Sequence, residues 1–172
     1  GNSGGSVGYP GASEGVLGVS ATDRRDVLAP FSSRGKGVDI AAPGVGVVQQ
    51  TICERGLNQC EIFPAYSGTS MAAPHVAAAA ALLVSLGVNK GEAVRARLLD
   101  SARVLGKGEA DRDRFGAGLL QAGAAAKQVM TQQLLARLAS LLLMVMLACY
   151  WGRKKGRLVA LRSAGFWVAA LS

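Results

Sequence analysis

The most constraining stretch of this sequence is a run of small and apolar residues that carries no charge. Val76–Leu86 is nearly all Ala, Leu and Val, with Ser85 as its one polar member. The run predicts a buried helix, and Gly87 fits its C-terminal stop. A buried helix needs other elements around it. Half of the 172 residues are hydrophobic, so the chain can bury a sizeable core.

Short apolar runs bounded by Gly and Pro precede this helix. They are Gly15–Ala21, Val38–Ala42 and Val45–Ile52. Runs of this length and composition are typical of strands in a sheet that is buried on both faces. Strands followed by apolar helices predict an α/β fold.

Two further helices are expected after the charge-free one. Asn89 can cap a second helix that runs to about Arg103. A charged, glycine-containing connection follows over Gly106–Gly118, and a third helical stretch covers about Leu119–Met130.

A serine stands at the start of the charge-free helix, in the string S-G-T-S-M-A-A-P-H-V of residues 67–76. Directly after a glycine turn, the hydroxyl of Ser70 is exposed at the positive end of the helix dipole. Its own backbone N–H is unpaired within the helix and can point at a developing oxyanion. Position alone favours an ordinary helix cap, because most serines at helix starts are only caps.

The whole string favours the chemical interpretation. G-T-S-M-A-A-P-H-V resembles the nucleophile motif of the subtilisin-like serine proteases (subtilases, peptidase S8 type) almost letter for letter. The resemblance implies that Ser70 is the acylated nucleophile. It also implies a subtilisin-like three-layer α/β fold with a mainly parallel sheet, of which this chain holds the C-terminal portion. Further landmarks in the family's order are Y-P-G-A at 9–12, F-S-S-R-G at 31–35, D-I-A-A-P-G at 39–44 and F-G-A-G at 115–118.

The first five residues, G-N-S-G-G, resemble the oxyanion-hole segment of the same family. By this resemblance Asn2 is the side-chain donor that binds the oxyanion together with the Ser70 N–H. Ser3, Gly4 and Gly5 then belong to the substrate-binding loop. Taken alone, an Asn in a Gly- and Ser-rich loop is more often a turn residue.

The catalytic Asp and His of the family have no match in this chain. The family's order is Asp, His, Ser, and everything before the oxyanion segment is absent. His75 is the only histidine, and it lies five residues beyond Ser70, more than one helical turn away. We therefore predict a packed helix residue rather than a base. Asp23, Asp26 and Asp39 are expected to be turn or surface carboxylates.

Without its base, a serine is a weak nucleophile, so residues 1–172 alone are not expected to hydrolyse peptides efficiently. The sequence predicts the C-terminal part of a serine endopeptidase that acts on polypeptides through a serine acyl-enzyme. An incomplete sequence explains the missing Asp and His better than a split protease does. The alternative is a membrane-anchored, non-catalytic pseudoprotease that only binds peptides.

The tail carries a second signal. Leu138–Trp151 has no charge, and extension back to Leu134 includes Arg137, which can snorkel to the interface. We predict a single span of the cell membrane over about 134–152. The basic residues 153–157 would be cytoplasmic and the peptidase part outside. A soluble amphipathic or buried helix remains the alternative. Residues 158–172 are expected to be disordered or on the membrane surface.

The uneven charge supports two parts, a peptidase portion over 1–130 and an anchor with a basic tail over 131–172. The first part has thirteen Lys and Arg against eleven Asp and Glu, and the second has six basic residues and no acid. The net charge of +8 is thus mostly a property of the tail. No nucleic-acid partner is predicted, since the tail has no binding-module pattern around it.

No cofactor is predicted. The spacing of Cys and His does not resemble a zinc site. Many subtilases bind Ca²⁺, which the family resemblance allows, but no ligand cluster in the sequence supports it. Cys53 and Cys60 flank a short polar loop and form either a disulfide or two free thiols. Cys149, inside the apolar tail segment, is expected to be a packing residue.

Overall fold

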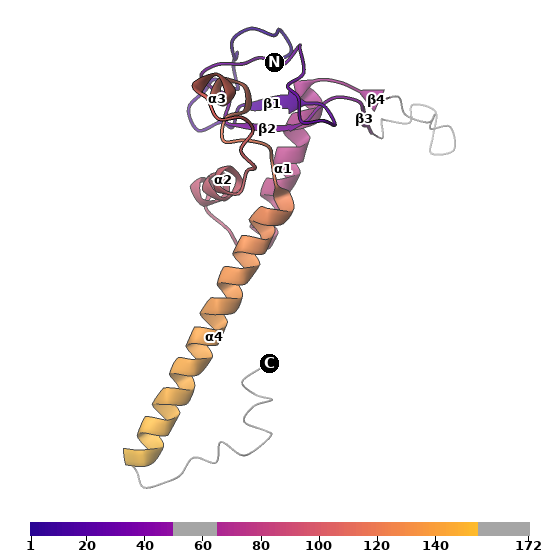
Figure 1. Ribbon diagram of the computed structural model, residues 1–172. Coiled ribbons are helices and arrows are strands. Elements are labelled where there is room, and N and C mark those ends of the chain that lie inside the picture. The colour runs from indigo at the N-terminus through magenta and orange to yellow at the C-terminus, as the bar shows by residue number, and fades with distance from the viewer. Residues whose placement is uncertain (50–64, 155–172) are drawn as a thin grey trace, which may run out of the picture. The chain divides into compact units, whose positions relative to one another are not determined.

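The computed structural model of the chain describes residues 1–49 and 65–154 (Figure 1). The strands are β1 (Val19–Thr22), β2 (Ile40–Pro43), β3 (Val47–Val48) and β4 (Ala65–Tyr66). The helices are α1 (Thr69–Ser85), α2 (Gly91–Asp100), α3 (Glu109–Phe115) and α4 (Ala122–Lys154). The chain divides into two compact units, Gly1–Lys127 and Gln128–Ser172. Cys53 and Cys60 lie outside the described residues.

The centre of the first unit is the pair of parallel strands β1 and β2. Val19 lies opposite Ile40, and the register continues to Thr22 opposite Pro43. The residues between are almost all small and buried, which allows elements to pack closely on both faces. β3 and β4 form a separate two-residue antiparallel ladder. The predicted parallel, two-sided sheet is confirmed, although the described sheet is small.

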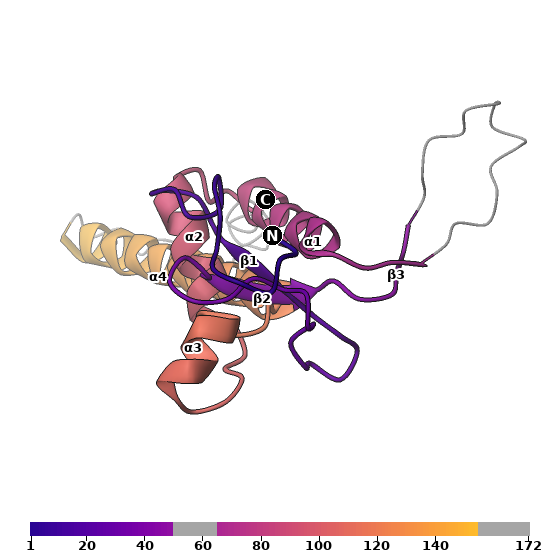
Figure 2. The ribbon, with the colours of Figure 1, turned by 90° about the horizontal axis from the view of Figure 1, so that it is seen from above.

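Helices lie on both sides of these strands. Figure 2 shows α1 and α2 on one side and α3 on the other, and α1 packs against both strands and α2. The buried residues of α1 are Ala72, Val76, Ala79 and Leu83, whose spacing places them on one face of the helix. The three-layer α/β fold is therefore confirmed.

Helix α1 differs from its prediction in length and burial. It begins at Thr69, so Ser70 lies within its first turn and not before it. It is also buried on one face only, and the exposed fraction reaches 52% at Val84. Its end agrees with the prediction, because Gly87 takes a φ of 91° and its N–H donates to the Val84 carbonyl.

Two predictions about the following segments were wrong. Asn89 does not cap α2, whose N-cap is Lys90 and whose last residue is Asp100. The predicted connection over 106–118 contains the short helix α3. Asp111 stabilises its start, since its Oδ2 accepts hydrogen bonds from the N–H groups of Lys107 (3.0 Å) and Gly108 (3.2 Å). This N-terminal acidic signature was missed in the sequence.

The third predicted helix and the tail helix are one continuous helix, α4. It has 33 residues, about 50 Å at 1.5 Å rise per residue. The polar residues between its two predicted parts include no Pro or Gly that would interrupt a helix. Its most apolar window has a mean hydropathy of 1.9, and none of that window is buried. By length and composition α4 can cross a membrane. The domain boundary after residue 130 stays a prediction.

Gly44, directly after β2, lies at a close contact between this strand, β1 and the turn before α1. A Cβ at this position would lie 2.6 Å from the Ala21 Cβ and 2.8 Å from the Gly68 carbonyl oxygen. We expect Gly44→Ala to lower the free energy of unfolding by roughly 1–3 kcal/mol, as other overpacked cores do. Chemical denaturation measures this loss. The control is Gly91→Ala, where a Cβ meets nothing within 4 Å. Equal stability of the two variants would contradict the packing described here.

Candidate active site

Ser70 is the second residue of α1 and is exposed. The first N–H groups of a helix lack partners within the helix, and here two of the first three find other acceptors. The Thr69 N–H donates to the side chain of Asn2 (2.8 Å), and the Met71 N–H to the Gly68 carbonyl (3.0 Å). The N–H of Ser70 has no partner among the described residues, and neither has its hydroxyl. Both groups are therefore available to a ligand.

The turn before Ser70 is attached to the end of the central strands. The Gly68 N–H donates to the Gly44 carbonyl (2.8 Å), and the Gly44 N–H donates to the Thr22 carbonyl (2.9 Å). These bonds place Ser70 at the carboxyl ends of β1 and β2. Ligands of open parallel sheets bind at this end of the strands.

Asn2 lies beside the same turn. Its Oδ1 accepts hydrogen bonds from the Thr69 N–H at 2.8 Å and from the Thr69 hydroxyl at 2.9 Å. With the oxygen engaged twice, the orientation of the amide is fixed and its nitrogen is left to donate. The structure thus brings together Asn2 and Ser70, the two residues predicted from distant parts of the sequence.

The bond from Asn2 also has a structural role. The N-cap of α1 is Gly68, which has no side chain to cap the helix. The side-chain oxygen Oδ1 of Asn2 instead caps the helix, although Asn2 lies outside it in the sequence. Any test of Asn2 must therefore separate helix capping from hydrogen bonding to a ligand.

The other predicted residues of the first loop are held against residues 31–34. The Gly4 N–H donates to the Phe31 carbonyl at 2.7 Å, and the Ser3 and Ser33 hydroxyls lie 3.1 Å apart. The Gly5 carbonyl accepts from the Arg34 N–H at 2.8 Å. These hydrogen bonds hold the loop in place. Substrate binding by Ser3, Gly4 and Gly5 stays a prediction.

His75 is not packed, and this prediction was wrong. The residue is exposed, and its Nδ1 lies 2.8 Å from the carbonyl oxygen of Met71, one turn earlier in α1. The ring therefore bonds to the helix backbone and not to Ser70. Among the described residues, none forms a hydrogen bond with the Ser70 hydroxyl that would mark it as a base.

Asp23 and Asp26 are turn carboxylates, as predicted, whereas Asp39 is partly buried and also accepts a hydrogen bond from the Gly18 N–H (2.8 Å). Asp23 accepts from the N–H groups of Val27 (2.9 Å) and Arg25 (2.8 Å), and the bond from Val27 is the main reason why the pKa of Asp23 is lowered. Asp39 pairs with the guanidinium of Arg95 at 2.5 Å. Asp26 forms an ion pair of 2.6 Å with the guanidinium of Arg103.

Thr69 is the residue of this site that sequence reasoning missed. It donates both of the hydrogen bonds that hold the Asn2 amide. Its place between Gly68 and Ser70 in the nucleophile string was visible, but the residue it contacts lies 67 positions away. The sequence feature that could have pointed to this role is the Thr69 hydroxyl, directly before Ser70.

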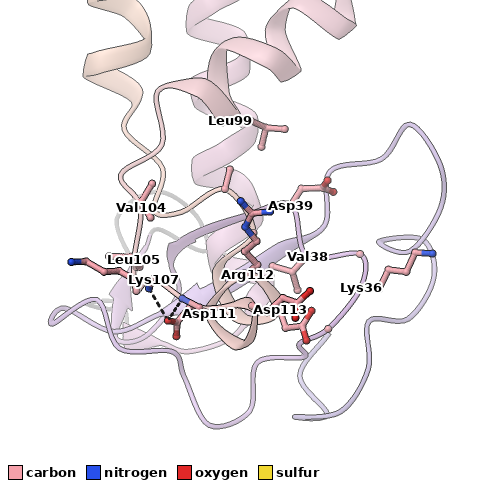
Figure 3. A pocket seen from close by; sticks show the side chains of 17 residues that line it. Lys36, Val38, Asp39, Leu99, Val104, Leu105, Lys107, Asp111, Arg112 and Asp113 are labelled. Atoms are coloured by element: carbon pink, nitrogen blue, oxygen red, sulfur yellow. Dashed lines mark hydrogen bonds between the residues drawn. The ribbon is translucent and has the colours of Figure 1, made fainter.

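A cavity of about 750 Å³ lies elsewhere in the first unit (Figure 3). It lies between the segment Gly35–Asp39 and the residues around α3, and it includes the Asp111 side chain that binds the Lys107 and Gly108 N–H groups. Neither Asn2 nor Ser70 lines it. No group of three or more potential metal ligands occurs in the described ranges 1–49 and 65–154. The candidate site is therefore the open surface at the start of α1.

Comparison with known proteins agrees with this geometry. The model of the subtilase family (Peptidase S8) matches residues 1–118. Alkaline elastase YaB of Bacillus sp. (strain YaB) is 40% identical over 129 residues, which are 74% of this chain and 31% of the elastase. Subtilisin Savinase of Lederbergia lenta is 39% identical over 129 residues, or 74% of this chain and 44% of that protein. The chain belongs to the subtilase family.

Solved structures agree as well. The self-cleaved protease domain of PatA has a TM-score of 0.60 and 29% identity, covering 76% of this chain and 48% of that one. The CspB protease of Clostridium perfringens has a TM-score of 0.61 and 27% identity, with coverages of 73% and 29%. The chain thus spans less than half the length of these relatives.

Two substitutions separate the capping and donor roles of Asn2. Asn2→Ala removes the acceptor for Thr69. We expect this change to lower the free energy of unfolding by about 1 kcal/mol, as for other lost caps. Asn2→Asp keeps an acceptor and adds a negative charge at a helix start, which is favourable. We expect its stability in chemical denaturation to equal or exceed that of the wild type. Equal destabilisation by both substitutions would contradict the capping role.

Proposed function

We propose that the protein is a serine endopeptidase that cleaves polypeptides through an acyl-enzyme on Ser70. The observation that carries this proposal is the placement of Ser70 and Asn2 at one helix start. Each has a backbone or side-chain N–H without a partner in the described part of the chain. Family membership supports the same reaction class.

The reaction begins when the Ser70 oxygen attacks the carbonyl carbon of a peptide bond. The proton of the hydroxyl passes to a base, and the carbonyl oxygen becomes an oxyanion. The Ser70 N–H and the Asn2 amide donate hydrogen bonds to that oxyanion. Donors held in place in advance are effective because they need not reorganise as charge develops. The C–N bond then breaks, the amine leaves with the proton, and water hydrolyses the acyl-enzyme.

Thr69 is a positioning residue in this scheme. It touches the Asn2 oxygen twice and so directs the amide nitrogen. The positive end of the α1 dipole adds to the field at the oxyanion.

The base is proposed to come from outside residues 1–172. The family's Asp and His fill this role by resemblance, and the chain spans only 31% and 44% of two of its relatives. A histidine oriented by a carboxylate would take the Ser70 proton and return it to the leaving amine.

We further propose that α4 anchors the protein in the cell membrane as a single span over about 134–152. The exposed apolar residues of this stretch support the proposal: Leu134, Leu135, Leu138, Leu142, Leu143, Met144, Met146, Leu147, Tyr150 and Trp151. Arg153 and Lys154 follow, and the positive-inside rule places them in the cytoplasm. The peptidase part then faces outward.

Peptide hydrolysis by the full-length protein tests the first proposal. We expect Ser70→Ala to abolish cleavage of a casein substrate. We expect Asn2→Asp to lower kcat about 10²–10³-fold, the loss known for the corresponding donor in the relative subtilisin. Because Asn2→Asp keeps the cap of α1, its matched stability is the control. A folded full-length protein that binds peptides but does not cleave them would instead support a pseudoprotease.

Single arginine substitutions test the membrane span. Met144 and Met130 are 56% and 57% exposed, but only Met144 lies inside the proposed span. We expect Met144→Arg to reduce the carbonate-resistant membrane fraction, because a central arginine costs about 2.5–3.5 kcal/mol on insertion. Met130→Arg should have no effect. If both variants stay equally in the membrane fraction, or if the wild type is soluble, the proposed span is wrong.

A further inference from the structure

A second cavity of the first unit is lined by more basic residues than acidic ones. It has a volume of about 570 Å³, and ligand sites typically have roughly 300–1,000 Å³. We call it the arginine pocket, after its charged lining residues: Arg25, Arg34, Arg103, Arg114 and Asp26. Neither Asn2 nor Ser70 lines it. It is therefore a different site from the candidate active site.

The positive charge is a local property of this pocket. Residues 1–130 as a whole are nearly balanced, with thirteen Lys and Arg against eleven Asp and Glu. The pocket has four arginines and a single acid in its lining. The field inside it therefore favours a negatively charged ligand.

Ordinary structural roles account for three of the four arginines. Arg103 forms an ion pair with Asp26 (2.6 Å), which engages the acid of the lining. Arg25 lies 3.6 Å from the carboxylate of Asp23. Arg114 belongs to the last turn of α3, where a positive charge interacts favourably with the helix dipole. None of these explanations applies to the fourth arginine.

That residue, Arg34, is held close to Arg114 by the backbone. The N–H of Gly35, which follows Arg34, donates to the carbonyl of Asp113, which precedes Arg114, at 2.7 Å. Neither guanidinium has a hydrogen-bond or ion-pair partner in the part of the chain that the structure describes. Like charges held close together repel each other. A bound anion would offset this repulsion.

The rest of the lining is mainly apolar. Its apolar members are Val27, Leu28, Ala29, Pro30, Leu105 and Phe115. A matching ligand therefore combines negative charge with apolar groups. A phosphate ion has no apolar part, and a bilayer presents its headgroups on a broad surface, whereas these side chains line a cavity.

A polypeptide segment with acidic and apolar side chains supplies both kinds of group. Carboxylates pair with guanidinium groups through two parallel hydrogen bonds. The lining also includes main-chain donors, since the N–H groups of Leu105 and Gly106 have no acceptor within the described ranges 1–49 and 65–154. A peptide carbonyl can accept from such groups.

We propose that the arginine pocket binds an acidic segment of another polypeptide. Carboxylates of this segment pair with Arg34 and Arg114. Its apolar side chains contact Leu28, Leu105 and Phe115. Binding of this kind needs no peptide hydrolysis, so the inference goes beyond the proposed function and does not depend on it.

Isothermal titration of the full-length protein with a short synthetic peptide of alternating Asp and Leu tests the proposal. The protein carries Ser70→Ala, so that the peptide is not cleaved. We expect saturable binding that weakens at least about tenfold in the variant Arg34→Glu/Arg114→Glu, which loses two charge-assisted pairs. The matched control is Lys36→Glu/Arg112→Glu, which changes the net charge equally but in residues that line the other cavity.

The control variant should bind the peptide as the unsubstituted pocket does. Equal weakening in both double variants, or no saturable binding before substitution, would overturn the inference. If Arg34→Glu/Arg114→Glu does not fold, as judged by circular dichroism, Arg34→Gln/Arg114→Gln replaces it with the same expected loss.

Other ligands test the chemistry of the occupant. The same peptide with Asn in place of Asp should bind at least about tenfold more weakly, because it lacks the carboxylates. Equal binding of the two peptides would overturn the inference. Displacement of the acidic peptide by a single-stranded oligonucleotide, or by vesicles of anionic lipid, at a lower concentration of negative charge would overturn the assignment to a polypeptide.

Casein hydrolysis by the protein with Ser70 intact keeps this inference distinct from the proposed function. Peptide binding that depends on Arg34 and Arg114, in a folded protein that does not hydrolyse casein, would support the inference and count against the proposed function. Hydrolysis together with binding that is insensitive to both arginines would overturn the inference and leave the proposed function standing.

Discussion

The hydrogen bond from the Gly68 N–H to the Gly44 carbonyl is the contact on which the rest of the site depends. It joins the end of β2 to the turn before α1, and it is possible because no side chain at Gly44 separates the two backbones. The buried faces of Ala21 and Ala72 close around the same point. The position of Ser70 is therefore fixed by the packed strands and helix of the fold. A larger residue at this junction would collide both with Ala21 of β1 and with the Gly68 carbonyl of the turn.

At the start of α1 some N–H groups have hydrogen-bond acceptors among the described residues and one does not. The unpaired N–H is the one that can bind a ligand. The Thr69 N–H donates to the Asn2 side chain and the Met71 N–H donates to the Gly68 carbonyl. The Ser70 N–H has no partner in the described residues. The bond to Asn2 has two effects, since it caps the helix and also orients an amide donor. A structural interaction and an electrostatic one thus share the same side chain. This explains why stability and activity must be measured together in variants of Asn2.

The sequence predicted the elements that depend on short-range pattern and on the family motifs. It predicted the parallel strands, the end of α1 and the closeness of Asn2 to Ser70. It failed where tertiary context decides. His75 was expected to be a packed helix residue, yet it is exposed. Asn89 had a capping side chain, but α2 begins after Lys90, without a side-chain cap. The contact between Thr69 and Asn2 could not be read from positions 67 residues apart.

The central claim is that Ser70 is an activated nucleophile. The most direct measurement is to treat the full-length protein with a fluorophosphonate and to map the adduct by peptide mass spectrometry, beside a Ser70→Ala control. The account predicts a single adduct on the peptide that contains Ser70, absent from the control. A folded protein that forms no adduct, or one that reacts equally after Ser70→Ala, would contradict it.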